Sequence, residues 1–184
     1  MPIPLGRTAA FPGIKFRQPG QYVDIAICNV ELVPWNDYQT GQPKRNDAGE
    51  IRQQELVTGV FIRGTGVITS DDSTDVVPAE GTIVAIYCAG HHRWDFIQAQ
   101  KKLDGRMNVG DVMRVKFTGE EPGQGSLPKK VWSFMLRHPQ PGEEQRTAQC
   151  EGLYAQLNSE AASSSQPAQM TLTSQPLPED EEPF

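Results

Sequence analysis

The sequence predicts an all-β fold: a five-stranded barrel with one short helix between strands three and four, followed by a disordered C-terminal tail. Two observations support this prediction. Five segments rich in β-branched and aromatic residues alternate with turn-rich connections, which is the pattern of a small antiparallel fold. From residue 139 onward the composition changes to Ser, Gln, Pro and acidic residues, which cannot bury enough apolar surface to form a core.

The predicted strands cover residues 21–33, 53–69, 82–89, 111–118 and 131–138. Gly59, Gly64 and Gly66 interrupt the second strand, which indicates bulges or sharp coiling of the kind that small barrels need at their corners. Residues 1–20 are punctuated by Pro and Gly, and we expect them to form an N-terminal arm. The folded domain is therefore predicted to span 21–138.

One segment, 91–104, has helical spacing instead. The residues that recur at this spacing are Trp94, Ile97 and Lys101, and also Phe96, Ala99 and Leu103, with Gly105 as a stop. A five-stranded barrel whose helix lies between strands three and four is the layout of the OB-fold, and its ligand face is flanked by two loops. The corresponding connections here are the long ones, 34–52 and 119–130.

The region after the domain is predicted to be a linker, 139–178, that contains a short helix near 143–162. One side of that helix would carry Cys150, Leu153, Tyr154, Leu157 and Ala161. Residues 163–178 are rich in Ser, Gln and Pro, so we expect them to be disordered.

The last six residues, 179–184, form an acidic tip with the sequence EDEEPF. It combines an apolar Phe184 side chain with a free α-carboxylate and four acids. A partner with a small apolar pocket rimmed by Lys and Arg would bind such a unit. The alternative is a solvated acidic tail that keeps the protein soluble.

Charge is distributed unevenly along the chain. The whole chain carries 23 acidic and 17 basic residues, for a net charge of −6, which by itself argues against binding to nucleic acid. From residue 139 onward there are eight acids and one base, which leaves 15 acids and 16 bases in 1–138. The body is therefore mildly basic, and the acidic tail masks this in the total.

The tip resembles that of bacterial and phage single-stranded DNA-binding proteins, which ends on acids followed by Pro-Phe and comes after an OB barrel and a disordered linker. The body resembles phage-encoded members in FPGIKFRQPGQYVDIAI, DYQTGQPKRNDAGEIRQQ and NVGDVMRVKFTGEEPG. The resemblance implies a phage-encoded protein that coats single-stranded DNA in replication, recombination and repair. It also implies that the tip recruits replication and recombination proteins through Glu179, Asp180, Glu181, Glu182, Pro183 and Phe184. The strand motifs of the standard bacterial protein are not seen, so homo-oligomerisation stays open.

A surface that binds single strands needs cations for phosphates and aromatic rings on which bases stack. The candidate residues are Trp35, Tyr38, Lys44, Arg45, Arg52, Arg63, Arg114, Lys116, Lys129, Lys130 and Trp132. Trp35 and Tyr38 stand in a polar loop, which favours function over packing. Trp132 fits a place in the barrel core equally well. Around Arg114 and Lys116, apolar residues alternate with cations, so this strand should show its cations on the face away from the core.

No motif indicates catalysis, so we expect a protein that is not an enzyme and has no cofactor. Cys88, His91 and His92 are close in sequence, but further ligands for a metal are not found at suitable spacing. The three widely spaced cysteines indicate reduced thiols. Neither a signal peptide nor an apolar run of membrane-spanning length is present, which predicts a cytoplasmic protein of a bacterial host cell. The alternative function is an OB-like protein-interaction or virion structural module without a nucleic-acid role; a small nuclease lacks support.

Overall fold

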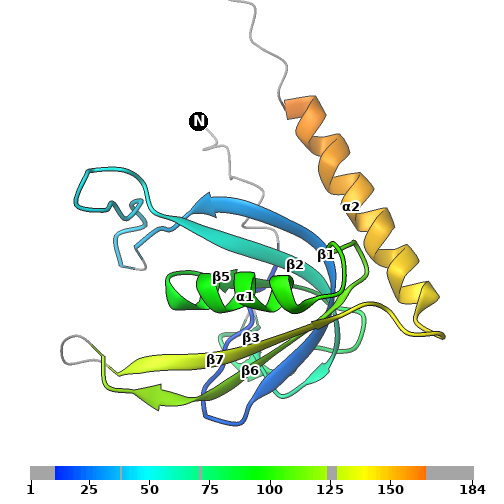
Figure 1. Ribbon diagram of the computed structural model, residues 1–184, viewed down its shortest axis with the longest axis horizontal. Helices are drawn as coiled ribbons and strands as arrows, with labels where there is room; N and C mark the ends of the chain where they lie inside the picture. Colours follow the sequence, from blue (N-terminus) through cyan, green and yellow to red (C-terminus); the bar gives the residue numbers. More distant parts are fainter. Residues whose placement is uncertain (1–10, 38, 71, 124–127, 165–184) are drawn as a thin grey trace, which may run out of the picture.

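The computed structural model describes residues 11–37, 39–70, 72–123 and 128–164 (Figure 1). Within them the chain is mainly β, and its five long strands form one antiparallel sheet in the order β5-β2-β1-β6-β7. The elements are β1 (Tyr22–Pro34), β2 (Gln53–Gly64), β3 (Ile68–Thr69), β4 (Asp75–Val76), β5 (Ile83–Cys88), α1 (His91–Lys102), β6 (Val112–Glu121), β7 (Lys129–Arg137) and α2 (Glu144–Ser164). The prediction of a mainly β chain with five strands is confirmed. The short strands β3 and β4 pair with each other in a separate hairpin.

The sheet bends where β1 and β2 slip in register. Shifts occur between Asp24 and Ile25, and again between Ile27 and Asn29. Gly64, at the end of β2, has a φ of 150°, and a Cβ atom there would lie 2.3 Å from the Tyr22 carbonyl oxygen. A residue without a side chain is therefore required where the two strands approach most closely.

The five-stranded barrel that the sequence predicted is not closed in the structure. β5 and β7 are the two edges of the sheet, and within the described residues no strand ladder joins them. α1 lies across this opening (Figure 1). Its Phe96 side chain is fully buried, with the ring centroid 6.0 Å from that of Phe134 on β7. A helix seated between the edge strands keeps them apart, so they cannot pair directly.

The segment before β1 also belongs to the fold, although 1–20 was expected to be an arm. Ile14 donates its backbone N–H to the Ala85 carbonyl of β5, at 2.8 Å. Phe16 is 4% exposed and packs in the main core. Its apolar side chain stabilises this placement more than the flanking Pro and Gly residues disfavour it. Residues 1–10 lie outside the described part of the chain.

The two faces of the sheet bury different sets of residues. The concave face and α1 enclose the main core, which includes Val23, Ile25 and Ile27 of β1. On the opposite face, α2 packs its Cys150 against a smaller cluster that includes Cys28 and Val60. α2, Glu144–Ser164, therefore lies where a helix was expected near 143–162 within the linker, and it packs on the sheet. The tip, 179–184, and the rest of the expected disordered segment from 165 onward lie outside the described residues.

Candidate nucleic-acid interface

The long connection between β1 and β2 is folded upon itself. The backbone N–H of Trp35 donates to the Arg52 carbonyl at 2.7 Å, that of Lys44 to the Trp35 carbonyl at 2.8 Å, and that of Arg52 to the Lys44 carbonyl at 2.8 Å. Asp37 Oδ1 accepts backbone N–H bonds from Gln39 and Thr40 at 3.0 and 3.1 Å. These bonds lower the pKa of Asp37. The loop is thus ordered by local hydrogen bonds of the kind that an Asp side chain commonly accepts in turns.

This folding brings two cations to one indole. Lys44 Nζ lies 4.8 Å from the centroid of the half-buried Trp35 ring, and the Arg52 guanidinium lies 4.9 Å from it. Lys44 also contacts Asp37, with Nζ 3.6 Å from Oδ2, but an exposed pair of this kind is weak. An aromatic ring and two positive charges therefore stand within one small surface, which is the combination that a base and its phosphate require.

The first turn of α1 lies beside Trp35. A Cβ atom at Gly90 would be 3.9 Å from the Trp35 ring, so the ring lies next to the residue before the helix. Trp94 is one turn further along the helix, and its backbone N–H donates to the Gly90 carbonyl at 3.3 Å. The Trp94 side chain is 60% exposed, and Lys101 Nζ lies 5.6 Å from its ring centroid. We call Trp35, Lys44, Arg52, Trp94 and Lys101 the indole surface.

Trp94 was not among the residues predicted to bind DNA. The sequence did contain a signal for the exposure of Trp94. Two sets of residues in α1 have helical spacing, and a surface helix buries only one of its faces against the core. The structure buries Phe96, Ala99 and Leu103, which leaves the Trp94 side in solvent.

Trp132 is partly buried and lines the main core. It packs against the main core, with its ring centroid 5.2 Å from that of Phe16. His92 stacks on it at 3.9 Å between centroids, with 14° between the ring planes. One ring face is covered in this way, so the packing interpretation of Trp132 accounts for its position.

The stacked His92 makes stability depend on pH. Burial lowers the pKa of His92 to about 4. As pH falls below about 6.5, the unfolded chain therefore takes up a proton that the folded chain still excludes. We expect the free energy of unfolding to fall by about 1–2 kcal/mol between about pH 7 and 5, after allowance for the part of the ring that water still reaches. Urea titrations of the parent and His92→Phe at both pH values test this, and an equal loss in the two proteins would contradict it.

Lys129 and Lys130 lie within β7 and not at the end of a loop. Their cross-strand partners on β6 are acids: Glu121 faces Lys129 and Glu120 faces Lys130. Lys130 Nζ donates to the Phe16 carbonyl at 3.2 Å. Both cations are thus next to opposite charges or engaged with the backbone. The ends of β6 and β7 extend to the same side of the molecule as the β1–β2 connection (Figure 1).

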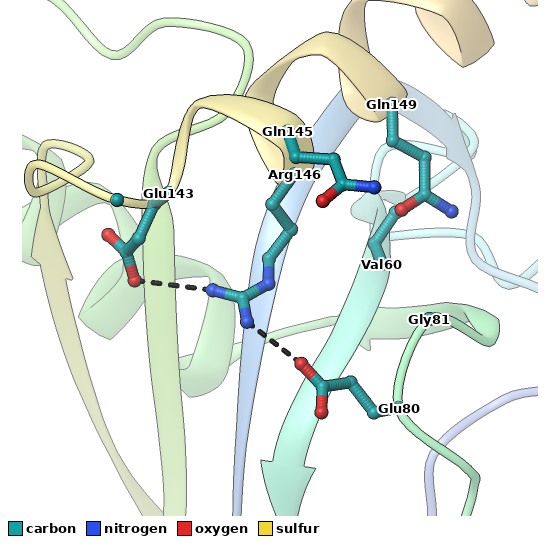
Figure 2. Close-up of a pocket in the computed structure, with 8 residues that line it drawn as sticks. Val60, Glu80, Gly81, Glu143, Gln145, Arg146 and Gln149 are labelled. Atoms are coloured by element: carbon teal, nitrogen blue, oxygen red, sulfur yellow. Dashed lines mark hydrogen bonds and ion pairs between the residues drawn. The ribbon is translucent and has the colours of Figure 1, made fainter.

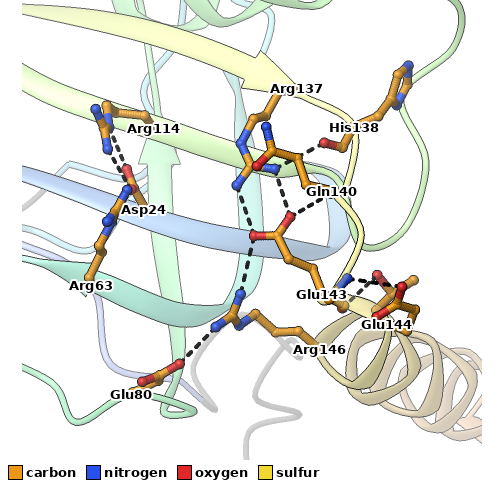
Figure 3. Close-up of polar contacts among 12 residues, drawn as sticks. Asp24, Arg63, Glu80, Arg114, Arg137, His138, Gln140, Glu143, Glu144 and Arg146 are labelled. Carbon is orange, nitrogen blue, oxygen red and sulfur yellow. Dashed lines mark hydrogen bonds and ion pairs between the residues drawn. The ribbon is translucent and has the colours of Figure 1, made fainter.

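Arg63 and Arg114 lie on the face of the sheet opposite the main core. They share the carboxylate of Asp24, a residue only 4% exposed (Figure 3). Arg63 Nε is 2.9 Å from Asp24 Oδ2, and Arg114 donates from Nε and Nη2 at 2.6 and 2.7 Å. Burial raises the pKa of Asp24. The two arginines lower the same pKa by more than burial raises it, so the net shift is downward. Lys116 is exposed on β6, two residues beyond Arg114.

A second polar surface connects α2 to the sheet. Arg137 and Arg146 both contact Glu143, at 2.7 and 3.3 Å, and lower its pKa to about 2. Arg146 also contacts Glu80 at 2.8 Å, across a pocket of about 260 Å³ (Figure 2). The lining of this pocket is polar. Arg146 is held there between Glu143 and Glu80. These ion pairs fix the start of α2.

The predicted residues are therefore divided between places. Trp35, Lys44 and Arg52 come together, whereas Arg63 and Arg114 lie on the other face of the sheet. Arg45 donates to the Gly49 carbonyl of its own loop at 2.6 Å. Tyr38 lies outside the described residues, as do Glu179, Asp180, Glu181, Glu182, Pro183 and Phe184.

The Cys88 and His92 side chains are engaged in packing. Cys88 is fully buried, and burial raises the pKa of its thiol. In the described parts of the chain, no three His, Cys, Asp or Glu side chains are grouped so that they could hold a metal ion. No helix among the described residues is both long and apolar enough to span a membrane.

Comparison with known proteins adds no relative. No protein-family model, curated protein or solved structure gives a match to the chain.

Proposed function

We propose that this protein binds single-stranded DNA through the indole surface, and that its body is an OB-type domain. The observation that carries the proposal is the arrangement at Trp35, whose ring has Lys44 and Arg52 within 5 Å of its centroid. A base stacks on such a ring while the neighbouring cations neutralise its phosphate.

The strand order supports an OB-type domain. Counted along the chain, the five long strands lie in the order 3-2-1-4-5, and a helix follows the third. An OB-fold is a five-stranded and partly open barrel, and oligonucleotides bind beside the loop between its first two strands. In this chain that loop carries Trp35.

The two cations of the loop provide the first test. We expect Lys44→Ala and Arg52→Ala each to lower the slope of log affinity against log salt by about 0.7, because each removes one phosphate contact. The assay is a titration of a fluorescent oligo-dT at several salt concentrations. The matched control is Arg106→Ala, an exposed cation beyond the other end of α1. If all three variants keep the slope of the parent, the indole surface does not bind the phosphates.

We also propose that the tip recruits a replication or recombination protein. Phe184→Ala removes the apolar anchor and keeps all four acids, so we expect it to abolish recruitment while DNA binding stays unchanged. Leu177→Ala is the control, since it removes an apolar side chain from the preceding segment. A pull-down with purified host replication proteins measures this. Equal recovery by the parent and Phe184→Ala would contradict the anchor.

A protein-docking module is the second candidate, and one observation favours it. Leu32, near the end of β1, and Ile51, shortly before β2, are 51% and 39% exposed. Exposed apolar side chains of this size are common at protein interfaces. Leu32→Ser separates the two functions, because it should weaken the docking of a protein and leave the salt-dependent binding of oligo-dT intact.

A further inference from the structure

Two cysteines meet where α2 packs on the sheet. Cys28 of β1 and Cys150 of α2 are both 0% exposed and belong to one cluster. Their Sγ atoms lie 3.7 and 3.4 Å from the same acceptor, the carbonyl oxygen of Ala26. The two thiols are also near enough that each shifts the pKa of the other. Two sulfur atoms that approach the same carbonyl oxygen lie near each other, so a small movement would bring them to bonding distance.

The alternation of side chains along β1 gives Cys28 this orientation, at a bulge in the strand. Ile27 is paired with Gly59 and Asn29 with Thr58, so Cys28 is the extra residue that has no partner in the ladder. Ile27 packs into the main core, and Cys28 joins the cluster under α2 on the other face. Ala26, two residues earlier, lies in the same cluster, as the alternation of strand side chains requires.

The two thiols differ in acidity. The nearby Cys150 thiol, together with burial, raises the pKa of Cys28. The Cys28 thiol in turn lowers the pKa of Cys150, and Arg146, one turn earlier in α2, acts in the same direction. The thiolate is the reactive form of cysteine, so Cys150 is the attacking group.

We propose that Cys28 and Cys150 form a reversible disulfide on exposure to hydrogen peroxide, and that this bond locks α2 onto β1. The Cys150 thiolate attacks one peroxide oxygen, the O–O bond breaks, and the departing hydroxide takes a proton to become water. The Cys28 sulfur then attacks the resulting sulfenic acid, which forms the S–S bond and releases a second water. Two thiols are oxidised by two electrons, and one peroxide is reduced to two waters.

The lock would strengthen an attachment that is otherwise modest. In the reduced protein α2 is held by the small apolar cluster and by the ion pairs of Glu143 and Arg146. A disulfide between residues 28 and 150 closes a long loop of chain, which restrains the unfolded state strongly. Because both sulfurs are buried, peroxide reaches them when α2 lifts, and the new bond then prevents further lifting.

The test uses the full chain and counts its thiols in denaturant after peroxide treatment. The parent, with three cysteines, should fall from three thiols to one, lose the mass of two hydrogens and remain monomeric on a non-reducing gel. Cys88→Ser is the matched control and should fall from two thiols to none. Cys28→Ser and Cys150→Ser should form no intrachain disulfide.

Two further readouts report on α2. The melting temperature of the oxidised parent should rise by about 5–15 °C and return on reduction. Amide hydrogen exchange in 144–155 should slow at least tenfold, and neither change should occur in Cys28→Ser. Survival of all three thiols in the parent, loss of Cys88 at the same rate as the other two, or disulfides between chains in place of the internal one would overturn the proposal.

Discussion

Replacing Trp35 and Trp94 together by alanine is expected to weaken the binding of single-stranded DNA by at least about 30-fold. Each ring that stacks on a base contributes about 1–3 kcal/mol, and the two stand on adjacent elements that lie next to each other at Gly90. The single variants should each show part of this loss. Affinity is measured by titrating a fluorescent oligo-dT at low salt.

The control for that experiment is Tyr154→Ala. Tyr154 is also an exposed aromatic residue, at 44%, but it lies on α2. It should bind DNA as tightly as the parent. Circular dichroism establishes that the variants are folded. If the double variant binds like Tyr154→Ala, bases do not stack on the indole surface.

Replacing Asp24 by alanine is expected to lower the free energy of unfolding by about 2–3 kcal/mol, which is a fall of about 4–12 °C in melting temperature. The variant removes a buried carboxylate that holds Arg63 and Arg114 side by side. Without it, the two guanidinium groups repel each other over a small cavity. Their own side chains are 67% and 41% exposed, so water offsets part of the cost and keeps it below that of a fully buried pair.

Asp75→Ala is the matched control for Asp24→Ala. Asp75 also pairs with an arginine, Arg17, at 2.6 Å, but its side chain is 33% exposed, against 6% for that of Asp24. Its loss should change the melting temperature much less, because exposed ion pairs contribute little. Thermal melts of the three proteins under the same conditions measure the difference. Equal shifts in the two variants would mean that the buried position of Asp24 has no special role.

The strands could be predicted because each is rich in the apolar and β-branched residues that a sheet buries. This enrichment is a local property, so 21–33 and 82–89 agree closely with β1 and β5. The burial of Phe16 was not predictable in the same way, because Pro and Gly around it favour an arm. Its position depends on contacts with β5 and β7, which are distant in sequence.

The site shows the same division between local and distant information. Trp35 in a polar loop was identified from its surroundings in the sequence. Its proximity to Lys44 and Arg52 depends on how the loop folds, and its position next to Gly90 depends on where α1 sits in the opening of the sheet. The meeting of Cys28 with Cys150 required the docking of α2 on the sheet, which composition does not specify.

Preference of this protein for single-stranded DNA, as proposed, is tested most directly by a competition titration monitored by intrinsic tryptophan fluorescence. The parent is titrated with oligo-dT and with a hairpin duplex of the same nucleotide count, between about 50 and 200 mM salt. The account predicts that oligo-dT quenches the fluorescence, that its affinity falls as salt rises, and that the duplex competes poorly. Absence of binding at the lowest salt, or equal affinity for the duplex, would contradict it.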